Sequence, residues 1–83
     1  MKLPIIRQFF ENQTPEKLEA TLEVLESFSE FRGTKEEELN LVGEMITNIC
    51  GALEVHENVK NGAQPKDALN AFAQKVMGSI DRA

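Results

Sequence analysis

The 83-residue chain has no tryptophan, no tyrosine and a single cysteine, Cys50. A lone cysteine excludes an internal disulfide and the Cys-x-x-Cys pair of redox proteins, and it fits a reducing compartment. The chain also lacks any stretch approaching the roughly 20 apolar residues of a membrane-spanning helix. The apolar run before Arg7 is too short for a signal peptide. We therefore expect a cytoplasmic protein without a membrane partner.

Positive charge is also scarce, because 9 lysines and arginines stand against 14 acidic residues, for a net charge of -5. Binding to nucleic acid depends largely on lysine and arginine neutralising phosphates, and binding to anionic membranes depends on the same charges. We therefore expect no nucleic-acid partner. The length and the 41% hydrophobic content predict a single globular domain over residues 1–83.

No segment alternates between apolar and polar residues, so the sequence predicts helices and no strands. The first helix is expected from about Pro4 to Asn12, although an extended arm would explain the same apolar residues. Thr14 and Pro15 are typical of a second helix start, and Gly33 is expected to end that helix. Gln64 and Pro65 open a last helix whose apolar face continues to Ile80. The predicted fold is an all-α bundle of three main helices and a short N-terminal one.

The third helix is expected to be the longest, from about residue 35 to residue 61. A capping box of Thr34 and Glu37 would open it, and Gly62 would end it. Its apolar residues recur in steps of three and four: Leu39, Val42, Ile46, Ile49, Leu53 and His56. A helix of this length spans about 40 Å, whereas a compact chain of this size has a radius of gyration of about 12 Å. Unless the helix bends at Gly43 or Gly51, we expect a homodimer that uses it and the phenylalanines.

Small residues form a ridge on this helix, because Gly43, Thr47 and Gly51 follow one another at a spacing of four. Two glycines inside a helix cost about 1 kcal/mol each relative to alanine, so something should offset them. Close approach of another helix is the favoured interpretation, and a ligand lying against the backbone is the alternative. Glu54 is a polar residue near the same surface, and Asn48 is either a buried polar contact or an outward-facing side chain.

His56 and Cys50 are the only candidates for catalysis. His56 lies between Glu54 and Glu57 and could act as a general base, although a packed or interface histidine is favoured. Lys60 occupies the place of the second histidine in the His-Glu-x-x-His signature, so we expect no metal site. Cys50 has uncharged neighbours, which favours a small core residue over a reactive thiol. No cofactor is expected.

Carboxylates recur along the second helix every three or four residues, at Glu16, Glu19, Glu23, Glu26 and Glu30. Such a stripe is usually a solvated helix face. Its functional alternative is a docking surface for a basic protein partner.

Two resemblances accompany these patterns. The stretches from Asn40 to His56 and from Phe72 to Asp81 resemble a family of short, uncharacterised, all-helical bacterial proteins. The segment from Glu37 to Phe72 resembles part of the helical core of the alkylhydroperoxidase D and carboxymuconolactone decarboxylase families. The second resemblance implies that His56 matches the family histidine, Gly62-Ala63 the family loop and Glu37 its proton-relay carboxylate.

The chain departs from the second pattern where its chemistry resides. Ile49 and Ala52 occupy the positions of the two family cysteines. Thiol peroxidase chemistry needs one sulfur to attack and another to resolve, and this chain has only one. The sequence thus favours a non-enzymatic homodimeric interaction or assembly protein. A small-ligand-binding helical module and a divergent enzyme relative without the cysteine pair are the alternatives.

Overall fold

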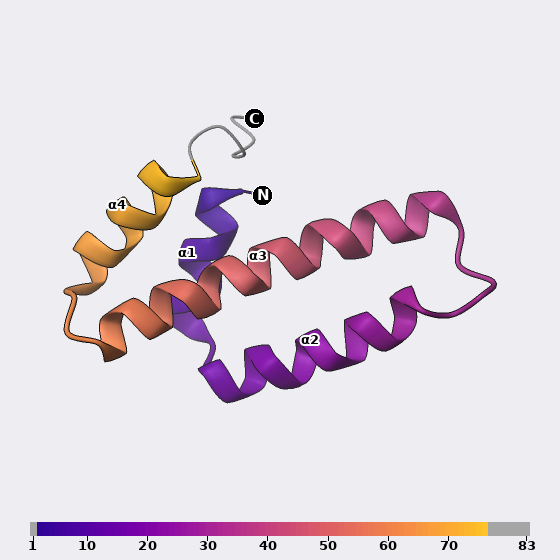
Figure 1. The fold of residues 1–83 in the computed structure, drawn as a ribbon, viewed down its shortest axis with the longest axis horizontal. Helices are drawn as coiled ribbons and strands as arrows, with labels where there is room; N and C mark the ends of the chain where they lie inside the picture. Colours follow the sequence, from indigo (N-terminus) through magenta and orange to yellow (C-terminus); the bar gives the residue numbers. More distant parts are fainter. Residues whose placement is uncertain (1, 77–83) are drawn as a thin grey trace.

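The computed structural model describes residues 2–76, which form four helices and no strand (Figure 1). The helices are α1 (Leu3–Asn12), α2 (Pro15–Ser29), α3 (Glu36–Lys60) and α4 (Pro65–Lys75). The predicted all-α fold is confirmed, and the N-terminal segment is a helix and not an extended arm. The predicted continuation of the last helix to Ile80 lies outside the described residues.

Local signals explain where most helices begin. Proline occupies one of the first two positions of α1, α2 and α4, where its missing N–H breaks no helical hydrogen bond. Thr14 caps α2 as predicted, because its Oγ1 accepts a hydrogen bond from the Lys17 N–H at 3.2 Å. These residues therefore set the joints of the fold without help from the core.

The capping of α3 differs from the prediction by one residue. Lys35 is the N-cap, and its backbone N–H donates to Glu38 Oε1 at 3.0 Å. Thr34 faces the other way, because its hydroxyl donates to the carbonyl oxygen of Phe31 at 2.8 Å. The threonine thus closes the turn after α2. It is not available to open α3.

The helix ends were predicted with mixed success. Gly62 follows the end of α3 with φ of +110°, a conformation that favours glycine, so the predicted stop is confirmed. By contrast, α2 ends at Ser29, four residues before the predicted stop at Gly33. The connection to α3 therefore spans residues 30–35.

The central helix α3 is continuous over 25 residues and is not interrupted at Gly43 or Gly51. Figure 1 shows α2 and α3 side by side as an antiparallel hairpin, while α1 and α4 lie near the end of the hairpin where α3 finishes. The opposite end, with the connection over residues 30–35, projects beyond them. The described chain measures 42 × 28 × 17 Å, so α3 extends well past the part that α1 and α4 cover.

The core lies where all four helices meet. It contains seven buried residues: Ile6, Leu18, Ile49, Ala52, Val55, Ala68 and Phe72. Since three of these belong to α3 and the others come from the three remaining helices, α3 is the element on which the fold is assembled. Val42, nearer the projecting end, is buried but lies outside this cluster.

Two rows of residues on α3 make these contacts. The predicted row faces α2, because Leu53 and His56 share a groove with Pro15 and Glu19. A second row also steps by three and four: Leu41, Met45, Asn48, Ala52, Val55 and Val59. This second row faces α1, because Asn48 is buried and its Oδ1 accepts a hydrogen bond from the Lys2 N–H at 2.8 Å. The amide of Asn48 therefore fixes the start of α1 on α3.

The two glycines of α3 differ in their surroundings. A Cβ on Gly51 would lie 2.9 Å from Phe72 Cζ and 3.0 Å from Ile6 Cδ1, whereas a Cβ on Gly43 would meet nothing within 4 Å. We expect Gly43→Ala to stabilise the fold by about 0.5–1 kcal/mol, the gain in helix propensity. Gly51→Ala should lower stability, because overpacking costs about 1–3 kcal/mol. Urea unfolding measures both, and equal stabilisation by the two variants would contradict the packing described here.

Candidate functional site

His56 is held in place by two contacts. Its Nε2 lies 3.1 Å from the carbonyl oxygen of Gln13, in the joint between α1 and α2. Its ring lies 4.6 Å from the ring of Phe10, measured between centroids. A carbonyl oxygen can only accept, so Nε2 is the protonated nitrogen in the assigned tautomer. The imidazole thus connects α3 to the preceding helices, and its Nε2 is occupied by the backbone.

Glu54 does not orient His56. Lys75 Nζ, on α4, donates to both Glu54 carboxylate oxygens at 3.0 and 3.1 Å. A groove of about 710 Å³ runs past His56 between α2 and α3, with Glu16, Glu19 and Glu57 among its lining residues. Within residues 2–76, however, no group of three histidine, cysteine or acidic side chains is arranged to hold a metal ion.

Cys50 is exposed, so the expectation of a core cysteine is wrong. It lines a shallow depression of about 220 Å³ with Thr47, Gly51 and Phe72. Partial burial of the thiol raises its pKa above the ordinary value, and the negative charge of Glu26 raises that pKa further. Both effects keep the sulfur protonated near neutral pH, which is the opposite of what a nucleophilic thiol requires.

The raised pKa predicts slow alkylation of Cys50. At pH 7.5 we expect iodoacetamide to react several-fold more slowly with the native protein than with the same chain in urea, because only the thiolate attacks. The rate should keep rising with pH beyond the point at which the urea-unfolded thiol has levelled off. Mass spectrometry of quenched samples measures both rates. A native rate equal to or above the unfolded rate would show that the thiol is activated.

The ridge of small residues does not form one site. Thr47 Oγ1 donates to the carbonyl oxygen of Glu44 within the same helix, at 2.9 Å. Gly51 is covered by Phe72 and Ile6, whereas Gly43 faces open space. The structure therefore places these three residues in three different environments.

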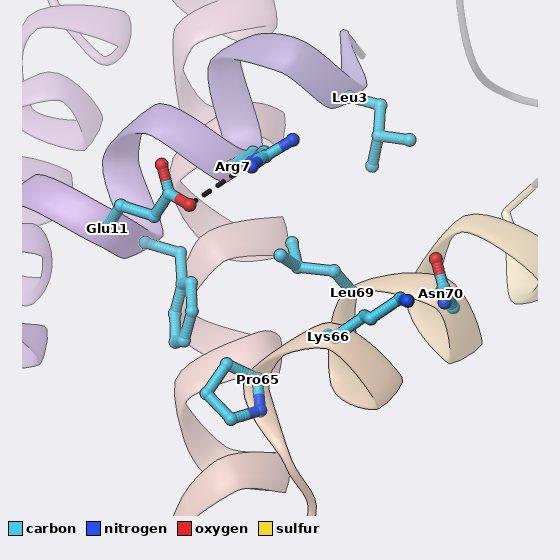
Figure 2. A pocket seen from close by; sticks show the side chains of 8 residues that line it. Leu3, Arg7, Glu11, Pro65, Lys66, Leu69 and Asn70 are labelled. Atoms are coloured by element: carbon cyan, nitrogen blue, oxygen red, sulfur yellow. Dashed lines mark hydrogen bonds and ion pairs between the residues drawn. The ribbon is translucent and has the colours of Figure 1, made fainter.

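A second groove, of about 590 Å³, lies between α1 and α4 and was not predicted (Figure 2). Leu3, Phe10, Pro65 and Leu69 supply its apolar lining. Figure 2 shows Leu69 between the two helices and Arg7 joined to Glu11, an ion pair of 3.1 Å. Lys66 and Asn70 line the α4 side. The groove is thus apolar inside and charged along its rim.

The projecting end of the hairpin carries an uncovered apolar surface. We call it the open face, and it consists of Val24, Phe28, Phe31, Leu41 and Met45. Val24 and Phe31 are 68% and 69% exposed, and Leu41 is 61% exposed. Phe28 and Phe31 therefore lie on the surface of a single copy and not in its core.

Helical spacing places the open face on the side where α1 packs. On α3, Leu41 and Met45 continue the row that α1 covers from Asn48 onward. On α2, Val24 and Phe28 continue a row that begins with Lys17 and Thr21, and Phe31 follows in the connection after this helix. The two rows meet beside α1, because Lys17, Thr21 and Met45 line one depression with Phe9. The open face is therefore the continuation of the α1-binding surface that α1 leaves uncovered, because α1 crosses the hairpin nearer its other end (Figure 1).

The carboxylates of α2 are exposed and lie on another side of the helix. In the described part of the chain, ion pairs join Lys2 to Glu44, Arg7 to Glu11 and Lys75 to Glu54, and none of them involves α2. The stripe is thus a solvated acidic surface in a single copy of the chain.

Comparisons with known proteins give one match. The search of curated proteins and the search of solved structures found none, so the partial resemblance to alkylhydroperoxidase D receives no support from them. No helix within residues 2–76 is long and apolar enough to cross a membrane. The predicted resemblance to an uncharacterised helical family is confirmed, because the model of a family of unknown function, DUF6952, matches residues 1–81. The chain belongs to this family.

Proposed function

We propose that this protein is a non-enzymatic helical assembly protein that forms a homodimer through its open face. The exposure of Val24, Phe28, Phe31, Leu41 and Met45 on one side of the hairpin is the observation that carries the proposal. Apolar side chains scattered singly on a surface are ordinary, whereas five gathered on one side of a helical hairpin form a patch that marks an interaction site.

The size of the open face suits a second copy of the chain. Side chains of these types and exposures present on the order of 500–600 Å² to solvent. A standard interface buries about 800 Å² per partner, and the polar residues around such a patch supply the difference. Burying this much apolar surface against a twin would also support α3 where α1 and α4 do not reach it.

The candidate chemical groups support a role without catalysis. Nε2 of His56 is hydrogen-bonded to the backbone, Glu54 is paired with Lys75, and the Cys50 thiol stays protonated near neutral pH. Catalysis by general acid, general base or nucleophile needs such groups to converge on one reacting atom. Here each one has a separate structural partner or environment. The cytoplasmic location and bacterial origin stay predictions.

The proposal is tested by thermal unfolding at several protein concentrations. When folding and association are coupled, the melting temperature rises with concentration, because mass action favours the associated native state. For a chain of this size we expect a rise of several degrees over a hundredfold range of micromolar concentration. A melting temperature independent of concentration over that range would refute association.

The groove between α1 and α4 favours a second candidate function, the binding of a small amphipathic anion. Its apolar lining suits a short hydrocarbon chain, and Lys66 on its rim suits a carboxylate, whereas Arg7 is already paired with Glu11. Octanoate should therefore raise the melting temperature more than octanol does, and Lys66→Gln should reduce that difference. Equal shifts with both compounds, or none, would remove this candidate.

The acidic stripe on α2 keeps its predicted role as a docking surface for a basic protein partner. Its carboxylates lie away from the open face, so such a partner could bind the dimer without displacing either copy.

A further inference from the structure

We infer that two copies pack through their open faces with their hairpins running in opposite directions. The tip of each hairpin, the projecting end with the connection over residues 30–35, then lies beside α1 of the other copy. This arrangement rests on the proposed homodimer and adds its geometry. Its two-fold axis crosses both hairpins at right angles to α2 and α3, between the two faces. Each α2 then lies on α2 of the second copy, and each α3 lies on α3.

Helix α1 covers the part of the α2 and α3 rows that lies away from the tip of the hairpin. It is fixed there at both of its ends: the Lys2 N–H donates to Asn48 Oδ1, and Gln13 accepts from His56. Ile6, between them, is completely buried. A helix is about 10 Å thick with its side chains, so α1 rises by that amount above the surface of α2 and α3. A second copy can approach the hairpin closely only at the open face, between α1 and the tip.

Symmetry favours an arrangement in which the two hairpins run in opposite directions. A closed homodimer uses the same patch on both copies, related by a two-fold axis. A two-fold axis parallel to the hairpins would place α1 of one copy on α1 of the other, and the two tips would also face each other. Two helices in the gap would then hold the open faces about 20 Å apart, twice the spacing of packed layers. An axis across the hairpins places each α1 beyond the tip of the other copy, so the faces can touch.

The extent of the open face indicates which residues lie nearest the two-fold axis. The open face includes Val24 and Phe28 on α2 and Phe31 in the connection that follows, so Phe28 is the middle residue of the three. On α3 it consists of Leu41 and Met45, and Met45 lies beside Phe9 of α1, so Leu41 is nearer the middle of the free surface. Residues on a two-fold axis meet their own symmetry copies, so Phe28 should contact Phe28 and Leu41 should contact Leu41. Phe31, at the tip, approaches α1 of the second copy.

Few unpaired carboxylates lie next to the open face. The α2 row that includes the open face contains one lysine and no carboxylate: Lys17, Thr21, Val24 and Phe28. On α3, three carboxylates lie within one turn of Leu41: Glu38 accepts the Lys35 N–H, Glu44 is paired with Lys2, and Glu37 is exposed. Like charges brought together would destabilise an interface. The net charge of -5 resides mainly on other sides of the molecule.

Cross-linking tests the arrangement directly. In a Cys50→Ser background, Leu41→Cys should form a covalent dimer rapidly under mild oxidation, because a disulfide needs Cα atoms within about 4.4–6.8 Å. Phe28→Cys provides a second position near the axis. Leu39→Cys is the matched control, since it replaces the same residue type on the same helix but on another side. We expect it to react at least tenfold more slowly than Leu41→Cys.

The outcomes separate this arrangement from the dimer itself. Fast cross-linking at Leu41 or Phe28, with slow cross-linking at Leu39, supports the arrangement. If the melting temperature depends on concentration but neither Leu41→Cys nor Phe28→Cys cross-links faster than Leu39→Cys, the dimer stands and this geometry is wrong. If the melting temperature is independent of concentration, the proposed function fails together with the geometry.

Discussion

Phe72→Ala is expected to cost about 3–5 kcal/mol of folding free energy, the range for truncating a buried phenylalanine. Phe72 is 3% exposed and touches the surface of α3 at Gly51, where the absence of a side chain lets the ring approach closely. A domain of this length is stabilised by only about 5–10 kcal/mol. Urea unfolding followed by circular dichroism should therefore show a much lower midpoint or a chain already partly unfolded in buffer.

Two variants on the same helix keep that test specific. Phe72→Leu keeps most of the buried volume and should recover more than half of the lost stability. Asn70→Ala changes an exposed residue and should alter stability by no more than about 0.5 kcal/mol. A loss from Phe72→Ala no larger than that from Asn70→Ala would show that α4 is not anchored through this ring.

Leu41→Glu is expected to separate the dimer while leaving each copy folded. In one copy Leu41 is 61% exposed, so the carboxylate can stay in water and the fold loses little. In the proposed dimer the two copies of residue 41 meet near the axis, where two carboxylates would be desolvated close together. We expect the dissociation constant to rise at least a hundredfold, or about 2.7 kcal/mol. Sedimentation velocity measures the change, and circular dichroism verifies the helix content.

Leu39→Glu is the control for charge and position. Leu39 lies two residues away on another side of α3 and is 39% exposed. The Leu39→Glu variant should leave the dissociation constant of the dimer within about threefold of the wild-type value. If both variants dissociate the dimer equally, the interface does not follow the open face.

The sequence predicted the joints of this fold better than its layers. Proline and threonine marked the start of α2, and Gly62 marked the end of α3, because these signals act within a few residues. The second row on α3 is not recognisable as an apolar face in the sequence, because it includes a polar residue, Asn48, and a small one, Ala52. Both are buried only because α1 packs there, which no local pattern reveals.

The surfaces of interest depend on where distant elements end. Phe28 and Phe31 have the composition of core residues, and they are exposed because α1 leaves them uncovered. Likewise, the groove between α1 and α4 joins Leu3 and Arg7 to Pro65 and Leu69, which are far apart in the chain. Helical periodicity identifies one face of one helix at a time, so it could not bring these residues together.

In the proposed dimer a second copy of the chain covers the open face, and the native mass in solution decides whether it does. Sedimentation equilibrium of the wild-type protein over a hundredfold range of micromolar concentration should give, at its upper end, twice the chain mass of 9.3 kDa. It should show a shift toward the single chain on dilution. A mass of 9.3 kDa at every concentration would contradict the account, because Val24, Phe31 and Leu41 would then remain in water.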